Sequence, residues 1–202
     1  MMAEFDTYRT IKHKSEGIFR DRGSKFLSFA FPVYTVNEIH KILAALQKEY
    51  HGARHHCYAY RLGATKDLSR THDDGEPSGS AGNPIMGQIR SSDLSNILIV
   101  VVRYFGGTLL GVGGLINAYR KAAANAIQNA IIITAAEQDL IEVNFPYAMM
   151  NNIMKIMRDE GMKIQEQDFT ETCSIKALIR KSRTAQVLKR LSFTEGTSAR
   201  KL

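Results

Sequence analysis

The 202-residue sequence contains only two cysteines, Cys57 and Cys173, and no Cys-x-x-Cys pair. Zinc knuckles and dithiol redox centres both need closely spaced cysteines, so neither kind of site is indicated. Each cysteine lies in an apolar stretch that is typical of a strand. We therefore expect two reduced, packed thiols and a reducing compartment.

The sequence also lacks long apolar segments. The longest uninterrupted run, Ile97 to Val102, is far too short for a bilayer-spanning helix, which needs about 20 residues. The first residues, MMAEFDTYRTIKHKSEG, contain no apolar core of a secretory signal peptide. These absences predict a cytoplasmic protein with no membrane partner.

Familiar catalytic motifs are missing as well. No Gly-Lys-Ser/Thr follows the glycine-rich stretch, and there is no His-Glu-x-x-His or EF-hand pattern. The segment Gly79-Ser80-Ala81-Gly82 misses the Gly-x-Ser-x-Gly nucleophile elbow by one residue. Because no nucleophile–base pair or metal-ligand cluster can be named from spacing, we predict no catalytic residue, cofactor or metal.

What the chain does have is an ordinary globular composition with a basic surplus. Hydrophobic residues make up 44% and charged residues 23%, which is typical of a chain that buries a core. The formal net charge of +7 favours acidic partners such as nucleic acid. The surplus is spread along the chain, so any binding face must be assembled by the fold.

The hydrophobic pattern predicts an α+β protein with two domains, 1–136 and 137–202. In the first domain we expect strands over 24–33, 56–62, 96–103 and 131–134, and helices over 35–50, from Pro84, and over 115–129. Thr35 and Glu38 have the spacing of a capping box. Residues 63–83 are polar and glycine-rich, which predicts a long loop.

The strand and helix pattern starts afresh near Ala135. We expect strands over 140–145, 162–169 and 172–179, a helix opened by Pro146, and a last helix over 183–191 capped by Ser182. The order β-α-β-β-α predicts a ferredoxin-like domain. Its fourth strand would lie within 194–201.

The segment Gly82 to Gly111, GNPIMGQIRSSDLSNILIVVVRYFGGTLLG, resembles the signature of the IMPACT family, called the YigZ family in bacteria. That signature has a Gly, spaced aliphatic residues, an aliphatic pair, Arg, two aromatic residues, Gly-Gly, an aliphatic residue and Gly, and every position is filled here. The blocks Arg54–Tyr60 and Asp73–Gly79 also resemble the family. The resemblance covers most of residues 17–130.

The resemblance implies two particular folds. The N-terminal domain would be a βαβ domain like one found in a small-subunit ribosomal protein and in domain IV of elongation factor G. The C-terminal domain would be ferredoxin-like, similar to the last domain of elongation factor G. Eukaryotic relatives regulate translation initiation by competing with a stress-sensing kinase for its ribosome-associated activator, but they add an interaction domain that this sequence does not contain. That partner is therefore not carried over.

The first candidate site is an anion or nucleic-acid site at the end of the strand 96–103. Glycines allow close backbone approach, a helix N-terminus offers free N–H groups to an anion, and an Arg beside aromatic residues can hold a phosphate and stack bases. Its residues are Arg103, Tyr104, Gly106, Gly107, Gly111, Gly113 and Gly114. The alternative is that the glycines only serve turns and packing, that a carboxylate of the 73–76 loop neutralises Arg103, and that both aromatics lie in the core.

Two further groups are candidates. An ordered recognition loop would comprise Arg54, His55, His56, Asp73, Asp74, Glu76 and Ser78. Its alternatives are a divalent-cation site formed by the acidic residues, or plain turn chemistry. A basic face on the last helix would comprise Lys181, Arg183, Lys189 and Arg190, and its alternative is a solvated surface.

These features lead to a non-enzymatic RNA- or ribosome-associated regulator of translation as the leading hypothesis. RNA or the ribosome would be the partner. One alternative is a hydrolase or phosphate-ester enzyme that uses a pocket between 73–80 and 103–114. The other is a module that docks a protein partner.

Overall fold

The computed structural model describes residues 6–169 and 172–202, and in it the chain is an α+β protein with two compact units. The larger unit comprises residues 8–135. The smaller unit comprises residues 136–202 together with Asp6 and Thr7. The first five residues of the segment that shows no signal-peptide pattern lie outside the described residues.

The larger unit is built on a five-stranded sheet in the order β2-β3-β6-β4-β5, in which all neighbours are antiparallel. Its strands are β2 (Ser15–Asp21), β3 (Ser24–Pro32), β4 (His55–Leu62), β5 (Leu68–His72) and β6 (Ile97–Tyr104). A separate two-stranded sheet pairs β1 (Thr7–Ile11) with β7 (Ile132–Ala136). The central strand β6 is buried from Ile97 to Arg103, as its β-branched run predicts.

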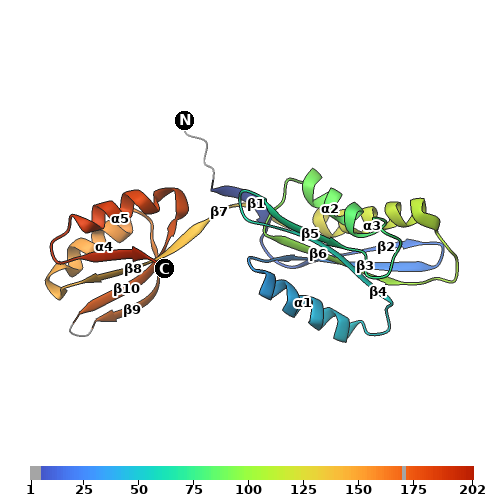
Figure 1. The fold of residues 1–202 in the computed structure, drawn as a ribbon, viewed down its shortest axis with the longest axis horizontal. Coiled ribbons are helices and arrows are strands. Elements are labelled where there is room, and N and C mark those ends of the chain that lie inside the picture. The colour runs from blue at the N-terminus through green and yellow to red at the C-terminus, as the bar shows by residue number, and fades with distance from the viewer. Residues whose placement is uncertain (1–5, 170–171) are drawn as a thin grey trace. The chain divides into compact units, whose positions relative to one another are not determined.

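Helices cover both faces of this sheet (Figure 1). On one face lies α1 (Val36–Glu49), and on the other lie α2 (Gly82–Ser91) and α3 (Gly111–Gln128). Each face has its own apolar cluster, so β6 contributes to two cores. The predicted N-cap of α1 is confirmed, because Thr35 Oγ1 accepts from the Glu38 N–H at 3.2 Å. The reciprocal bond of a capping box is shifted by one residue, because a Glu38 carboxylate oxygen accepts from the Tyr34 N–H at 2.8 Å.

The N-terminal unit differs from the prediction in its edge strands and in one helix start. β1, β2 and β5 were not predicted, and β5 lies inside the expected loop 63–83. Its residues are mostly polar and exposed, so they lack the alternation that identifies a half-buried strand. The prediction that the third helix begins near Leu115 is wrong, because α3 begins at Gly111. Glycine has a low helix propensity, so no sequence signal indicated that Gly111, Gly113 and Gly114 form the first turn of the helix.

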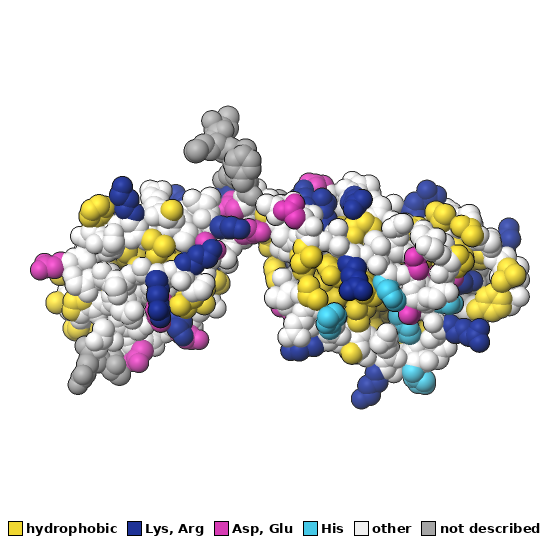
Figure 2. Space-filling model, viewed as in Figure 1, with side chains coloured by type: hydrophobic (Ala, Val, Ile, Leu, Met, Phe, Trp, Pro, Cys, Tyr) yellow, Lys and Arg dark blue, Asp and Glu magenta, His cyan; other side chains and the backbone are white. Residues whose placement is uncertain are grey.

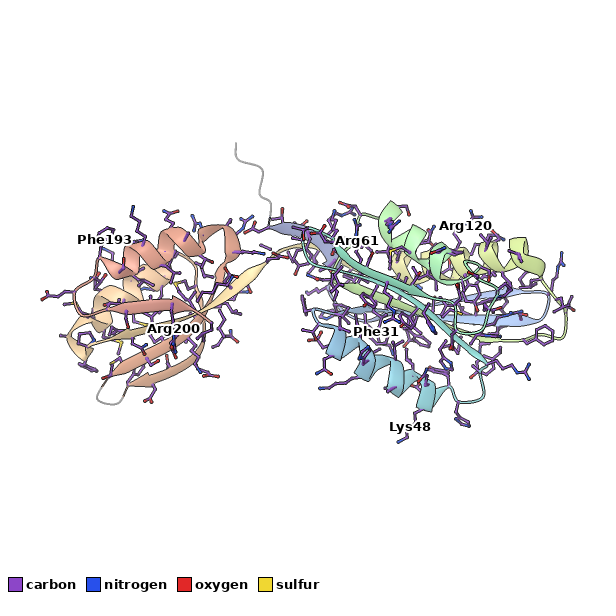
Figure 3. The ribbon with its side chains drawn as sticks, in the orientation of Figure 1. Phe31, Lys48, Arg61, Arg120, Phe193 and Arg200 are labelled. Atoms are coloured by element: carbon purple, nitrogen blue, oxygen red, sulfur yellow. The ribbon has the colours of Figure 1, made fainter. Side chains whose placement is uncertain are left out.

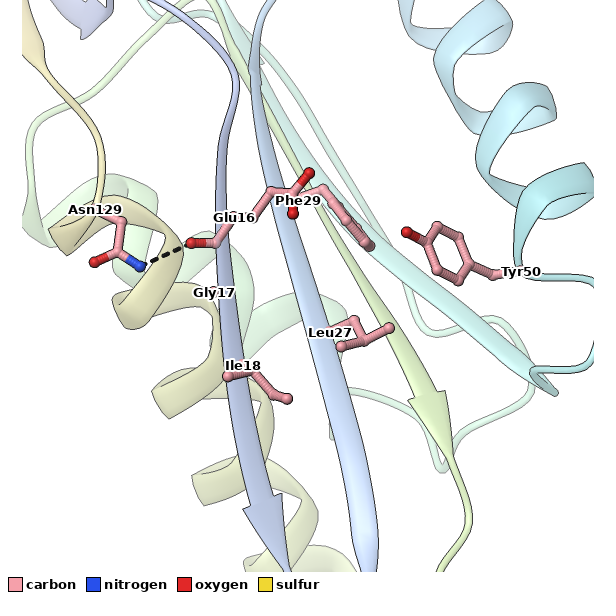
Figure 4. A pocket seen from close by; sticks show the side chains of 7 residues that line it. All are labelled: Glu16, Gly17, Ile18, Leu27, Phe29, Tyr50 and Asn129. Atoms are coloured by element: carbon pink, nitrogen blue, oxygen red, sulfur yellow. Dashed lines mark hydrogen bonds between the residues drawn. The ribbon is translucent and has the colours of Figure 1, made fainter.

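The outer edge of β2 is closed by a side chain of α3 and by that of its C-cap residue. Asn129 Nδ2 donates to the Glu16 carbonyl at 2.8 Å, as Figure 4 shows, and Asn125 Nδ2 donates to the Ile18 carbonyl at 2.8 Å. Unpaired carbonyls on an edge strand are a template for pairing with another chain. The two asparagines therefore protect this edge from such pairing.

The smaller unit has a four-stranded antiparallel sheet in the order β11-β8-β10-β9. Its strands are β8 (Gln138–Phe145), β9 (Lys163–Phe169), β10 (Cys173–Arg180) and β11 (Ser198–Lys201). The helices are the 3-10 turns η1 (Tyr147–Met149) and η2 (Lys181–Arg183) and the α-helices α4 (Met150–Asp159) and α5 (Thr184–Ser192). The predicted element order, including the fourth strand, is observed.

One capping prediction in this unit is wrong. The last α-helix begins at Thr184 after η2, and no side chain caps it. Ser182 instead donates its backbone N–H to Asp6 Oδ2 at 2.9 Å, and Arg180 Nη2 donates to Asp6 Oδ1 at 2.9 Å. Asp6 thus fastens the N-terminal segment to the end of β10.

Two other expectations concern the cysteines and membrane-spanning segments. Cys57 and Cys173 are free and buried, as predicted for packed thiols. Among the residues that the structure describes, no helix combines the length and the apolar character needed to cross a membrane.

Candidate functional site

The end of β6, the turn that follows it and the 75–77 segment line a cavity of about 460 Å³. Five of the predicted site residues are among its lining residues: Arg54, His55, Glu76, Arg103 and Gly111. The others are Gly75, Pro77 and the apolar group Phe105, Leu109, Leu110, Val112 and Leu115. The fold therefore brings members of the glycine-rich turn and of the predicted recognition loop to one place.

A buried ion pair forms one wall of this cavity. Arg103 Nη1 donates to Glu76 Oε1 at 2.7 Å, and only 6% and 3% of the two side chains are exposed. The Tyr119 hydroxyl donates to the same Glu76 oxygen at 2.7 Å. Of the two interpretations of Arg103, neutralisation by a carboxylate of the 73–76 loop is therefore the observed arrangement.

The aromatic neighbours of Arg103 have different environments. Tyr104 is half-buried and packs against the apolar cluster on the α1 face. Phe105 is 54% exposed, and its ring centroid lies 5.7 Å from the Arg103 guanidinium carbon. The expectation that both aromatics lie in the core is therefore wrong for Phe105, which follows the last residue of β6.

The acidic residues of the 73–76 loop hold the loop itself together. Asp73 accepts the backbone N–H groups of Gly79, Ala81 and Gly82 at 2.8 to 3.0 Å. Burial raises the pKa of Asp73, but these three bonds outweigh that effect and lower its pKa below the usual value. Asp74 Oδ2 accepts the His56 N–H at 2.7 Å. In the described part of the chain, no group of three or more His, Cys, Asp or Glu residues is arranged to hold a metal ion.

The remaining loop residues divide into buried and accessible ones. His56 is buried, desolvation lowers its pKa, and its Nε2 has no hydrogen-bond partner among the described residues. His55 is half-buried and its Nδ1 lies 2.8 Å from the Asp74 carbonyl oxygen. Arg54 and Ser78 are exposed, and Arg54 also lines the cavity. Arg54 is thus the accessible cation of this site.

The glycines of the turn serve different purposes. A Cβ on Gly106 would lie 1.9 Å from the backbone carbon of Gly23, so no side chain fits there. Gly107 and Gly111 have positive φ. Gly113 has neither constraint, because its φ is not positive and no described atom lies within 4 Å of the place where its Cβ would be. Gly106 therefore packs the turn, whereas Gly113 leaves open space beside the helix start.

The N-terminus of α3 can accept an anionic group. Gly111, Gly113 and Gly114 are in its first turn, and Leu110 provides no side-chain cap for the N–H groups there. Uncapped N–H groups and the helix dipole attract negative charge. Arg54, Phe105 and Leu109 line the same cavity as Gly111 at this helix start.

Three of the four residues of the predicted basic face in the smaller unit lie beside acidic partners. Lys181 contacts Glu137 at 2.7 Å, Arg183 contacts Glu160 at 3.5 Å, and Arg190 contacts Glu160 at 2.7 Å. Lys189 alone of the four has no ion-pair partner among the described residues. Figure 2 shows Lys and Arg side chains dispersed over the visible face. The four residues therefore offer less free positive charge than the sequence suggests.

The charges on the sheet face opposite the helices of this unit are also balanced. Arg200, labelled in Figure 3, contacts Glu142 at 2.6 Å, and Lys176 contacts Glu166 at 2.6 Å. The cross-strand register places these residues in one row, Arg200–Glu142–Lys176–Glu166. Positive and negative charges alternate along that row, so it does not form a cationic surface.

A second hollow, of about 280 Å³, lies near β2, β3 and the end of α1 (Figure 4). Its lining residues are Glu16, Gly17, Ile18, Leu27, Phe29, Tyr50 and Asn129. Burial, followed by the neighbouring Glu49, raises the pKa of Tyr50 to about 12. Glu16 contacts Lys14 at 2.7 Å. None of the predicted site residues lies here, and its acidic group is already paired.

Several residues of the cavity and of its buried ion-pair network were not among the sequence candidates. The exposed apolar residues Leu109 and Val112 lie in the glycine-rich segment, where unusual apolar character was the available signal. Tyr119 lies in α3, 43 residues after Glu76, and no spacing rule connects the two. Only the fold identifies Tyr119 as a partner of the ion pair.

Comparisons with known proteins agree with the signature in the sequence. The family model described as the Impact N-terminal domain matches residues 22–127, more than half of the chain. IMPACT family member YvyE of Bacillus subtilis (strain 168) is 28% identical over 88% of this chain and 82% of its own length. IMPACT family member YigZ of Escherichia coli (strain K12) is 30% identical over 86% of this chain and 87% of its own length.

A solved structure is similar over nearly the whole chain. It is described as the crystal structure of a hypothetical protein, with a TM-score of 0.73 and 26% identity, and the match covers 98% of this chain and 97% of that one. The likeness thus extends over both compact units. With the family model and the two relatives, these matches establish that the chain belongs to the IMPACT family.

Proposed function

We propose that this protein is a non-enzymatic, cytoplasmic, RNA- or ribosome-associated regulator of translation. One observation carries the proposal: the loop carboxylates Asp73, Asp74 and Glu76 are engaged in internal bonds, whereas Arg54 and the start of α3 line the cavity together with Phe105. Free positive charge next to an exposed aromatic ring suits a phosphate and its base.

The proposal includes the folds that the family resemblance implies. β3 and β4 both pair antiparallel with β6, so the unit β3–α1–β4 places parallel strands on either side of a third strand. This split βαβ arrangement supports the likeness to domain IV of elongation factor G. The strand order β11-β8-β10-β9 supports a ferredoxin-like C-terminal domain. Both likenesses favour a role at the ribosome, by analogy of fold.

An enzyme is the less favoured alternative. A hydrolase or phosphate-ester enzyme in this cavity needs a free general base or a metal cage. Asp73 is held by three backbone N–H groups, and Glu76 is held by Arg103 and Tyr119. Releasing either carboxylate for catalysis would break these hydrogen bonds, which are buried in the case of Glu76.

A second candidate function, docking of a protein partner, is favoured by the apolar rim of the cavity. Leu109 is 81% exposed, and Phe105 and Val112 are each 54% exposed. Clustered exposed apolar residues often mark interaction surfaces. In this case an apolar side chain of the partner would fill the cavity.

Association with RNA and ribosomes tests the proposal. The purified protein should bind a labelled 16-nucleotide single-stranded RNA, or sediment with ribosomes, and binding should weaken steeply with salt because phosphate contacts release counterions. Arg54→Glu should weaken binding. Lys48→Glu, a charge reversal at another exposed position, on α1 (Figure 3), should not.

The contrary outcomes are distinct. Absence of both RNA and ribosome association at 50 mM salt would overturn the proposal. Capture of a protein partner from lysate that survives nuclease, with no RNA binding, would favour the docking function. Turnover of a phosphate ester that disappears in Asp74→Ala would favour the enzyme.

A further inference from the structure

A polar groove runs between the edge strand β5 and helix α2. It has a volume of about 430 Å³ and is lined by Ser69, Arg70, Thr71, Asn83, Gly87 and Arg90, with the buried Met86. It shares no lining residue with the cavity beside Arg103. None of its residues was a candidate from the sequence, so it is a second surface of the larger unit.

The two arginines of the groove carry free charge. Arg70 and Arg90 are exposed, and neither has an ion-pair or hydrogen-bonding side-chain partner among the described residues. Arg103 and Arg190, in contrast, each contact a glutamate at 2.7 Å. The groove therefore keeps two unneutralised guanidinium groups, which match the geometry of phosphate oxygens.

Short polar side chains lie between these charges. Ser69 and Thr71 belong to β5, and Asn83 belongs to the first turn of α2. Thr71 Oγ1 and Asn83 Oδ1 are 3.5 Å apart, so the hydroxyl and the amide lie side by side. Hydroxyl and amide groups of this kind commonly contact phosphate and sugar oxygens of nucleic acids.

Gly87 keeps the groove open. It lies inside the ten-residue helix α2, where glycine is less favourable than alanine. Its φ is not positive, and nothing lies within 4 Å of the position of an added Cβ. Gly82, in the same helix, differs because its Cβ would lie 2.8 Å from the His72 nitrogen. Internal packing thus explains Gly82 but not Gly87, whose bare backbone lets a ligand approach.

We propose that this groove binds the phosphodiester backbone of RNA. The inference rests on the proposed function and adds a second contact surface to it. Among the described residues, no aromatic side chain lines the groove, so it offers phosphate and sugar contacts but no stacking platform for bases. Binding through the groove is therefore independent of base sequence and sensitive to salt.

The test uses the full chain and fluorescence anisotropy with labelled 16-nucleotide RNA and DNA strands of the same sequence, between 50 and 300 mM potassium chloride. Arg70→Glu and Arg90→Glu should each weaken RNA binding about five- to tenfold at 100 mM salt. Each should also reduce the slope of log affinity against log salt by about 0.7, the value for one lost phosphate contact on a single strand. Lys48→Glu, on α1 across the sheet, is the charge-matched control and should change neither quantity.

Gly87→Leu separates the groove from the fold. Leucine is a better helix former, so the melting temperature should stay the same or rise, while its side chain fills the groove and weakens RNA binding. Arg70→Glu and Arg90→Glu variants that bind RNA like Lys48→Glu would overturn the groove and leave the proposed function standing. A wild-type protein that binds no RNA even at 50 mM salt would overturn the groove, and one that also fails to sediment with ribosomes would overturn the proposed function as well. Binding of the DNA strand alone would overturn the assignment to RNA.

Discussion

Arg103 donates a 2.7 Å hydrogen bond to Glu76, and the pair is buried in the wall of the cavity. One of the two sequence-based expectations was that Arg103 would instead be free to bind an anion. Tyr119 donates to the same carboxylate oxygen, and the Cys57 thiol lies 3.3 Å from the Tyr119 hydroxyl. The four side chains form one network between β4, the loop, β6 and α3. Arg103 is therefore a structural partner of the loop. The groups left at this site to contact a negatively charged ligand are Arg54 and the N–H groups at the start of α3.

The first prediction concerns this ion pair. Arg103→Ala should lower the free energy of unfolding by about 3–5 kcal/mol, because Glu76 would remain buried without its cation. Glu76→Gln should cost less, since its amide oxygen still accepts from Arg103 and Tyr119. Urea unfolding midpoints measure both effects. Arg54→Ala, at an exposed position, should stay within about 0.5 kcal/mol of the wild type. An Arg103→Ala protein with wild-type stability would show that the pair contributes nothing to the fold.

The second prediction compares two glycines of the same turn. Gly106→Ala should destabilise the protein strongly, because its Cβ would lie 1.9 Å from the Gly23 backbone. Gly113→Ala should leave stability unchanged or raise it by up to about 1 kcal/mol, since its Cβ meets open space in a helical turn. Thermal melting of the two variants provides the comparison. Equal melting temperatures would contradict the close approach of the Gly23 and Gly106 backbones.

The sequence predicts best where one local signal dominates. The β-branched run of β6 indicated a strand buried on both faces, and Thr35 with Glu38 located the start of α1. In both cases the pattern that indicates burial or capping involves residues close together in the sequence. The same β-branched run also located Arg103 near the end of β6.

The rest depends on contacts between distant segments. The edge strand β5 is mostly polar and has no apolar pattern of its own. It is held in the sheet by its pairing with β4, which its own residues do not reveal. Glycine propensity argued against the first turn of α3, and tertiary packing of residues such as Leu115 overrides it. Glu76 and Tyr119 meet only after folding. Sequence spacing could therefore name Arg103 but could not choose its partner.

The third prediction is a pH dependence that arises from Asp6. Burial raises the pKa of Asp6, but hydrogen bonds from Arg180 and Ser182 outweigh it and lower the pKa to about 2. A depressed carboxylate pKa contributes stability that is present above the unfolded value, near 4, and is lost as the pH falls toward 2. Asp6→Asn should therefore remove part of the loss of stability between pH 4 and 2.

Unfolding midpoints of the wild type and Asp6→Asn, measured from pH 7 to pH 2, check this dependence. The control is Asp67→Asn, at an exposed position without an ion-pair partner among the described residues. It should follow the wild type throughout. Parallel curves for Asp6→Asn and the wild type would mean that the contact with Arg180 does not couple to protonation.

The fourth prediction concerns the compact units. Residues 8–135 contain both apolar clusters of the five-stranded sheet, so this fragment should fold and melt cooperatively when expressed alone. The fragment 1–136 should be no more stable, because its Asp6 lacks Arg180. Circular dichroism melting of the two fragments tests the division. A fragment 8–135 without a thermal transition would show that the larger unit depends on residues 136–202.

The last prediction decides between the two candidate functions of the cavity through Phe105. Its exposed ring offers a π-face to a base, and such stacking contributes about 1–3 kcal/mol per base by alanine substitution. If RNA stacks there, Phe105→Leu should lose nearly as much RNA affinity as Phe105→Ala, roughly ten- to a hundredfold, because leucine has no aromatic face. If a protein partner docks there, leucine should retain most of the binding and alanine should lose it, since buried apolar area then determines affinity. Because Phe105 is half exposed and follows β6, both variants should melt within a few degrees of the wild type. Wild-type binding of RNA and of a captured partner by Phe105→Ala would exclude both functions for this ring, and the cavity would then contact its ligand only through Arg54 and the start of α3.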